Sequence, residues 1–218
     1  MAKLNLCVPL SGRGSNLQAL IGACAKPDFP AKIGLVISNK PSAQGLLHAK
    51  NAGIPTLIVD HKAYSTRADF DRNMTKAMED NATDLVCLAG FMRLLSDEFC
   101  DHWRDRMINI HPSLLPSFKG LDVQQAAIDA GARFSGCTVH YVRKEMDTGP
   151  IIVQAAVPIS SNDTAETLAA RILVEEHKIY PQAVRLIAEG RISIENERAI
   201  IDGHIAPPDS QINPLPNE

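Results

Sequence analysis

Short apolar runs alternate with stretches of helical periodicity through the first half of the sequence. Residues 4–10 form the first run, and residues 32–38, 55–59 and 83–89 form the next three. Between these runs, apolar residues recur three and four positions apart, as on the buried face of an amphipathic helix. Strands that are separated by helices join one sheet in parallel. The sequence therefore predicts an α/β fold with a Rossmann-like open twisted sheet, mostly parallel and flanked by helices.

The second half of the sequence departs from this rhythm. Residues 137–142 and 151–157 are rich in β-formers with no helical stretch between them, so we expect an antiparallel pair. A short strand is expected at 191–194. With 218 residues, of which 45% are hydrophobic, the chain can bury one core. We therefore expect a single domain over residues 1–206 and an irregular C-terminal tail over residues 207–218.

Later helices are marked by their ends and by their apolar faces. Phe70, Met74 and Met78 recur at intervals of four and predict a buried helix face. Asp122 and Asp163 are expected N-cap residues, because a short polar side chain accepts a hydrogen bond from the first helical turn. The helices expected after the first span residues 42–51, 67–79, 122–130 and 164–180.

A glycine loop, Ser-Gly-Arg-Gly-Ser at residues 11–15, joins the first strand to the first helix. Gly12 and Gly14 permit backbone conformations that other residues adopt only at a cost. Backbone N–H groups at a helix start bind anions, so the loop fits a phosphate; a simple tight turn is the alternative. A dinucleotide fingerprint is disfavoured, because Leu17 stands where a third glycine belongs and no acidic residue ends the second strand.

A polar pair interrupts the fifth apolar run, at residues 107–111. Asn109 and His111 lie two positions apart, so they project from the same face of a strand. Pro112 ends the strand because it has no N–H to donate. His111 is therefore expected at the carboxyl edge of the sheet, where ligands bind in open α/β folds.

Asp147 lies in the turn before Gly149 and Pro150. If it converges with the imidazole of His111 and a nearby amide, the group could stabilise an oxyanion and move protons in acyl transfer. The alternative is a structural histidine in the core. A metal site that uses His111 and His140 lacks further ligands at suitable spacing, and His140 is expected to be structural.

Apolar side chains continue past the fourth strand, in the sequence Gly-Phe-Met-Arg-Leu-Leu at residues 90–95. In an exposed loop, such residues either pack beneath a lid or line a pocket for a flat heterocycle. The residues alone leave both alternatives open.

Charge and cysteine content indicate the partner and the compartment. The net charge of −3 gives no reason to expect a nucleic acid or a membrane, so we expect a small-molecule partner. Five cysteines without Cys-x-x-Cys spacing are typical of reduced core cysteines in the cytoplasm. No apolar run approaches the ~20 residues that span a bilayer, and no N-terminal signal is expected.

Four groups of motifs together resemble the folate-dependent formyltransferases. They are Asn-x-His-Pro-Ser-Leu-Leu-Pro (109–116) with Asp-x-Gly-Pro (147–150), Ser-Gly-Arg-Gly-Ser-Asn-Leu (11–17), Leu-Ala-Gly-Phe-Met-Arg (88–93), and Glu-His-x-Ile-Tyr-Pro (176–181). In combination they are most similar to the branch of the family that formylates glycinamide ribonucleotide in purine synthesis. The resemblance covers nearly the whole chain.

The resemblance implies which residues act. The implied catalytic residues are Asn109, His111 and Asp147. The implied ribonucleotide-binding residues are Gly14, Ser15, Asn16, Leu173 and Glu176, although Leu173 stands where relatives have a polar side chain. The implied folate-binding residues are Arg67, Met92, Arg93, Leu94, Leu95, Asn109, Val142, Arg143, Lys144 and Asp147. Without the resemblance, Arg67 and Glu176 read as solvated charges.

The implied reaction moves the formyl group of 10-formyltetrahydrofolate, a co-substrate, to the amino group of N1-(5-phospho-D-ribosyl)glycinamide, and needs no metal. Rival interpretations are a methionyl-tRNA formyltransferase, for which the sequence shows neither an RNA-binding domain nor a basic patch, and a 10-formyltetrahydrofolate hydrolase, which lacks the glycine loop. A non-catalytic folate- or nucleotide-binding module is the rival from another class. The oligomeric state is left open, with a homodimer as one alternative.

Overall fold

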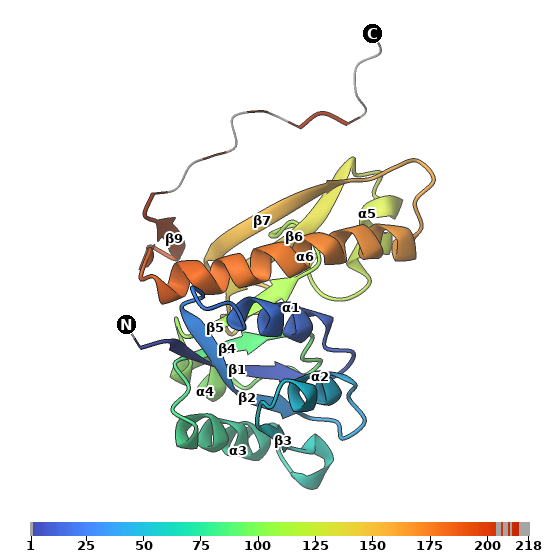
Figure 1. The fold of residues 1–218 in the computed structure, drawn as a ribbon. Coiled ribbons are helices and arrows are strands. Elements are labelled where there is room, and N and C mark those ends of the chain that lie inside the picture. The colour runs from blue at the N-terminus through green and yellow to red at the C-terminus, as the bar shows by residue number, and fades with distance from the viewer. Residues whose placement is uncertain (1, 204–205, 207–208, 210, 214–218) are drawn as a thin grey trace.

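The computed structural model describes residues 2–203, 206, 209 and 211–213. Seven strands form one sheet in the order β3-β2-β1-β4-β5-β6-β7 (Figure 1). Strands β1 to β5 pair in parallel, and β6 and β7 are antiparallel additions. The strands span Leu4–Leu10 (β1), Ala31–Ser38 (β2), Thr56–Ile58 (β3), Leu85–Leu88 (β4), Met107–His111 (β5), Phe134–Tyr141 (β6) and Ile151–Pro158 (β7). The predicted α/β sheet with antiparallel strands late in the chain is confirmed.

Helices cover both faces of this sheet, and each face has its own core (Figure 1). Along β1, Leu6 and Val8 pack into one core and Cys7 into the other, because alternate residues of a strand point to opposite faces. The first core contains residues of α1 (Ser15–Cys24), α2 (Gly45–Asn51), α5 (Val123–Asp129) and α6 (Ala165–Ala188), and the second contains residues of α3 (Arg67–Asp80) and α4 (Asp97–His102). The buried face predicted for Phe70, Met74 and Met78 on α3 is confirmed.

The strand order reverses between β1 and β4. From β1 the chain moves outward through β2 to β3, and it then returns to place β4 on the other side of β1. The loops that leave two such strands diverge to opposite faces and open a crevice between them, which is where open α/β sheets bind ligands. The glycine loop after β1 and the apolar loop after β4 meet here, since the Ser11 N–H donates to the Gly90 carbonyl at 3.1 Å.

Helix α6 is longer than the sequence predicted and begins one residue later. Thr164, not Asp163, is the N-cap, and its hydroxyl accepts the Thr167 N–H. Asp163 is engaged instead by the Arg171 guanidinium at 2.6 Å. The helix also continues through Pro181 to Ala188, because burial of its apolar face outweighs the loss of one backbone hydrogen bond.

Smaller differences occur at the ends of other elements. Helix α2 starts at Gly45 and not at residue 42. Asp122 does precede α5, but within the described residues its side chain caps no N–H, because its backbone is left-handed with φ 54°. The strand expected at 191–194 is β8 (Ile192–Glu195), and it forms a hairpin with β9 (Arg198–Ile201), which the sequence did not predict.

Two further expectations concern the C-terminal tail and membrane-spanning helices. Most of the irregular tail predicted for residues 207–218 lies outside the described residues. None of the helices in the described part of the chain is both long and apolar enough to cross a membrane.

Candidate active site at the carboxyl edge of the sheet

The glycine loop presents the unobstructed start of α1. Gly14 occupies the N-cap position with φ 75°, and no side chain among the described residues caps this helix. Gly14 also packs against α2, where a Cβ atom would lie 2.5 Å from the Gly45 Cα. The first-turn N–H groups, which begin at Ser15, are therefore left to bind an external acceptor. This geometry favours the anion site over the simple turn.

Asn16 and Glu176 meet beside this loop although they are 160 positions apart in the sequence. The Asn16 Nδ2 donates to Glu176 Oε2 at 2.7 Å, and both residues are buried. Burial raises the pKa of the Glu176 carboxyl. The Asn16 Oδ1 is buried without a hydrogen-bond partner among the described residues, so its capacity to accept is unmet in this structure. Glu176 is thus not the solvated charge that its position alone suggested.

Tyr180 fixes this part of α6 on the sheet. Its hydroxyl donates to the Leu88 carbonyl at 2.8 Å, and the side chain is fully buried. Because Glu176 lies one turn earlier on α6, this contact sets its distance from the loop after β4. Leu173 precedes Glu176 by three residues and is half-buried.

His111 and Asp147 converge, which the sequence analysis stated only as a condition. The Nδ1 atom of His111 lies 3.4 Å from Asp147 Oδ1, and the two side chains are only 6% and 11% exposed. The His111 Nε2 atom faces the Phe118 carbonyl at 3.0 Å. Both ring nitrogens thus face oxygen acceptors, an environment that satisfies an imidazolium.

The Asp147 carboxylate is held on its other side by backbone. Its Oδ2 accepts the Gly120 N–H at 2.7 Å, and its backbone is left-handed with φ 52°. Few residues other than glycine adopt this conformation, but aspartate and asparagine tolerate it better than most. Asp147 is therefore positioned by two elements, the loop after β5 and the turn between β6 and β7.

His140 lies next to Asn109, a contact that the sequence analysis did not anticipate. The two residues are directly opposed in the β5–β6 pair, and the Asn109 Nδ2 lies 3.4 Å from the His140 Nε2. The His140 Nδ1 contacts the carbonyls of Tyr141 at 3.0 Å and Thr148 at 3.1 Å. Burial lowers the pKa of His140, so its ring is neutral and donates from Nδ1. The free Nε2 then accepts from Asn109 and orients its amide.

The strand register carried a signal for this pair. If β6 and β7 form a hairpin beside β5, alternation puts the polar residues Thr138 and His140 of β6 on the face of Asn109 and His111. His140 is the one opposite Asn109, and its assignment as purely structural is incomplete, because its one free nitrogen faces the Asn109 amide.

The loop after β4 presents both apolar and backbone groups. Met92 and Leu94 are 64% and 60% exposed, whereas the Phe91 ring stacks on the Phe70 ring with their centroids 6.4 Å apart. The exposed pair is therefore available to a ligand and is not packed beneath a lid. The Met92 N–H donates to the Ser11 hydroxyl at 2.8 Å, which ties this loop to the glycine loop.

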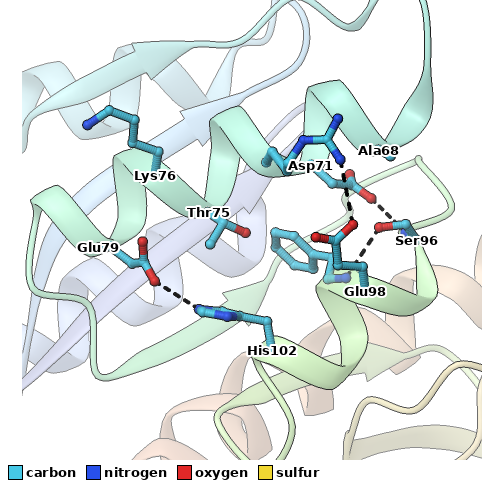
Figure 2. Close-up of a pocket in the computed structure, with 10 residues that line it drawn as sticks. Ala68, Asp71, Thr75, Lys76, Glu79, Ser96, Glu98 and His102 are labelled. Atoms are coloured by element: carbon cyan, nitrogen blue, oxygen red, sulfur yellow. Dashed lines mark hydrogen bonds and ion pairs between the residues drawn. The ribbon is translucent and has the colours of Figure 1, made fainter.

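Asp71 anchors the far end of the same loop. Its Oδ2 accepts the Ser96 N–H at 2.6 Å, as Figure 2 shows, at a groove of about 220 Å³ between α3 and α4. The side chain is 2% exposed, and burial raises its pKa against the opposing charges of Arg67 and Arg93. The two arginines implied as folate contacts, one from α3 and one from the loop, are thus both near enough to Asp71 for their charges to act on it.

Three other implied folate contacts lie at the start of the turn that carries Asp147. Val142 is half-buried, and its N–H donates to the Met107 carbonyl at 3.0 Å. Lys144 pairs with Asp101 at 2.7 Å. Arg143 is largely buried and bonded to other protein groups, so its side chain is not free for a ligand.

The convergent groups support acyl transfer. An amide donor, an imidazole with a carboxylate neighbour, an anion site and an apolar loop all lie along the carboxyl ends of β1, β4 and β5. They can bind an anionic substrate, receive a flat apolar one and stabilise a developing oxyanion. Among the described residues, no group of three or more His, Cys, Asp or Glu could hold a metal ion.

Comparisons with known proteins match nearly the whole chain. The formyl transferase family matches residues 4–184. Phosphoribosylglycinamide formyltransferase of Escherichia coli is 41% identical over 94% of this chain and 97% of its own length. The crystal structure of glycinamide ribonucleotide transformylase 1 from Symbiobacterium toebii has 46% identity and a TM-score of 0.89, over 91% of this chain and 94% of that one.

A second group of relatives is much longer. The trifunctional purine biosynthetic protein adenosine-3 of Bos taurus is 50% identical over 90% of this chain. The matched region is 20% of that protein, so the chain spans about a fifth of the length of these relatives.

Proposed function

The chain belongs to the formyl transferase family, and from this premise we propose that it transfers a formyl group from 10-formyltetrahydrofolate to glycinamide ribonucleotide. The E. coli relative that it spans almost completely is named a phosphoribosylglycinamide formyltransferase, and the trifunctional relatives are named as purine biosynthetic proteins. The proposed products are the N-formylated ribonucleotide and tetrahydrofolate, in purine biosynthesis.

The ribonucleotide is proposed to bind along the start of α1. Its phosphate would accept from the N–H groups of Gly14, Ser15 and Asn16, and its ribose hydroxyls would reach the Asn16–Glu176 pair. Two observations support this: the helix start is uncapped within the described residues, and a buried carboxylate with an unpartnered amide oxygen lies beside it. Leu173 adds an apolar contact at this end.

The folate donor is proposed to bind on the other side of His111. Its flat pterin would lie against residues 92–95, whose apolar side chains are exposed and whose ends are anchored by Ser11 and Asp71. Arg67 and Arg93 would meet the carboxylates of the donor. The backbone of residues 142–144 would complete the pocket.

The proposed chemistry needs no covalent intermediate. The neutral amine of the ribonucleotide attacks the formyl carbon, and the carbonyl oxygen becomes negative. The Asn109 amide and the His111 imidazolium stabilise that oxygen, and Asp147 provides the charge opposite the imidazolium. The proton lost by the amine and the proton gained by the leaving folate nitrogen are exchanged through this group.

The His111–Asp147 pair at 3.4 Å, on the same edge of the sheet as the uncapped start of α1, is the observation that carries the proposal. The test is an absorbance assay of the purified protein with 10-formyltetrahydrofolate, with and without glycinamide ribonucleotide. We expect tetrahydrofolate to form only when the ribonucleotide is present. Release without an acceptor would indicate the hydrolase, and no release in either case would indicate a binding module.

A further inference from the structure

The side chain of Arg143 is bonded to other protein groups and is not free to bind a ligand. The segment 142–149, here named the Asp147 loop, begins beside it. The Arg143 side chain is 11% exposed, with Nε 2.6 Å from Glu197 Oε2 and Nη2 2.8 Å from Asp105 Oδ1. Its Nη1 donates to the Val142 carbonyl at 3.1 Å. All three guanidinium nitrogens are therefore engaged by protein oxygens.

Arg143 also contacts the far end of the Asp147 loop. A Cβ atom on Gly149 would meet the Arg143 Cγ at 3.0 Å and would collide with the Tyr141 carbonyl oxygen. The aliphatic part of Arg143 thus packs where the loop returns to β7, and its charged end holds the start of the loop. Asp147 lies between these two points, so the position of Arg143 bears on the position of that carboxylate.

The partner Glu197 occupies an unfavourable backbone position. It is the second central residue of the two-residue turn between β8 and β9, with φ 59°, and Asn196 before it has φ 50°. Such turns favour Asn-Gly, and a residue other than Gly, Asn or Asp is strained in this conformation. Because glycine would remove this strain, the presence of glutamate indicates that its side chain has a functional role.

The contacts of the Glu197 side chain indicate that role. Glu197 bonds Arg143 through Oε2 and Arg104 through Oε1. The hydrogen bond from Arg143, together with the charges of Arg143 and Arg104, holds the pKa of Glu197 below its ordinary value, so Glu197 is ionised at neutral pH. Glu197 is also more than half exposed, so it adds little to the core.

We propose that Glu197 is a positioning residue for the donor site: through Arg143 it fixes the Asp147 loop and thereby sets the affinity for the folate donor. The proposal rests on the proposed function, because the donor is assigned to this side of His111. The β8–β9 hairpin then supports the Asp147 loop, which lies about 50 positions earlier in the sequence.

The test uses two glycine variants of the same turn. Glu197→Gly removes both the strain and the contact with Arg143, whereas the control, Asn196→Gly, changes the adjacent left-handed position and leaves Glu197 in place. We expect both to melt within about 3 °C of the wild type, since the strain relieved offsets the surface pair lost. We expect Glu197→Gly alone to raise the KM for 10-formyltetrahydrofolate about fivefold, with the KM for glycinamide ribonucleotide unchanged.

The path through Arg143 is tested by a double-mutant cycle. In an Arg143→Gln background, Glu197→Gly should change the donor KM by less than about twofold, because the contact is already absent. An effect of full size in that background would overturn the proposed path. A donor KM in Glu197→Gly equal to that of Asn196→Gly would overturn the proposal itself, as would an equal rise in the two substrates' KM values.

A readout without turnover separates this proposal from the proposed function. Trypsin cuts after arginine and lysine, so a loosened Asp147 loop should be cleaved at Arg143 and Lys144 faster in Glu197→Gly than in Asn196→Gly. Equal cleavage rates in the two variants would refute the proposal that Glu197 holds the Asp147 loop in place. The wild-type protein could lack ribonucleotide-dependent turnover while Glu197→Gly is still cleaved faster than Asn196→Gly. That result would refute the proposed function but would still support the role of Glu197 in holding the Asp147 loop.

Discussion

Replacing Asp147 by asparagine separates a catalytic His111 from a structural one. The substitution keeps the shape of the side chain, and asparagine tolerates the left-handed backbone at φ 52°. The amide oxygen can still accept the Gly120 N–H that now binds Oδ2 at 2.7 Å. We therefore expect the variant to fold and to melt close to the wild type.

The size of the effect on catalysis follows from the lost charge. At the 3.4 Å between His111 Nδ1 and Asp147 Oδ1, two unit charges in an effective dielectric of about 20 attract by about 5 kcal/mol. Desolvation and residual solvent reduce this figure, and half of it corresponds to about a hundredfold in rate. A positioned acid or base contributes ~10²–10⁴-fold. We expect kcat to fall by at least about 10²-fold.

The hydrogen bonds of the His111 ring should also change in the variant. In the variant, the amide NH₂ can face His111 Nδ1, while the Phe118 carbonyl still needs a hydrogen on Nε2. With Nδ1 as acceptor and Nε2 as donor, the ring can no longer offer a proton from Nδ1 to the reacting groups, which the proposed mechanism requires. The measurement is kcat with both substrates saturating.

Two results would refute this reasoning. One is a folded Asp147→Asn protein with near-normal kcat, which would make His111 structural. The other comes from the double variant with His111→Ala. Because the two groups would act as one unit, the double variant should be far less impaired than the product of the single losses. Fully multiplicative losses would show that they act independently.

Three further predictions concern the two substrate sites and the buried carboxyl. Ser15→Ala with Asn16→Ala should raise the ribonucleotide KM about tenfold or more with a smaller effect on kcat, since a non-reacting phosphate contributes uniform binding; a lower kcat with unchanged KM would contradict the phosphate assignment. Arg67→Ala and Arg93→Ala should raise the donor KM selectively, and steady-state kinetics with equal or larger losses for the ribonucleotide would reverse the assignment of the two pockets. Because burial raises the pKa of Glu176, the folded state holds a proton that the unfolded chain releases, and this stability is lost as the pH rises. Glu176→Gln should therefore gain melting temperature relative to wild type as the pH is raised above about 5, and parallel curves in scanning fluorimetry would refute this.

Features that depend on local periodicity were predictable from the sequence. Asn109 and His111 share a face because a strand alternates with period two, and Pro112 places them at the carboxyl edge. The return through the Asp147 turn followed from two β-rich runs with no helix between them. These inferences need only neighbours in sequence, and the structure confirms them.

Features that depend on distant contacts were not predictable. The continuation of α6 through Pro181 depends on burial against the sheet, which no helix signal encodes. The strand β9 was missed because its turn holds Asn196 and Glu197 in left-handed conformations without a glycine. Arg143 was expected to contact folate, but the sequence could not show that Glu197 and Asp105 occupy its guanidinium.

The loop after β4 and the Asp147 loop are held by buried side chains that lie outside them. The Ser11 hydroxyl binds the Met92 N–H, the Asp71 carboxylate binds the Ser96 N–H, and the His140 ring spans to the Thr148 carbonyl. Such anchors add little to a core, but they hold reacting groups in place, and displacement of about 1 Å can cost on the order of 10²-fold in rate. Substitutions at these anchors should therefore lower kcat or raise KM before they lower the free energy of unfolding appreciably.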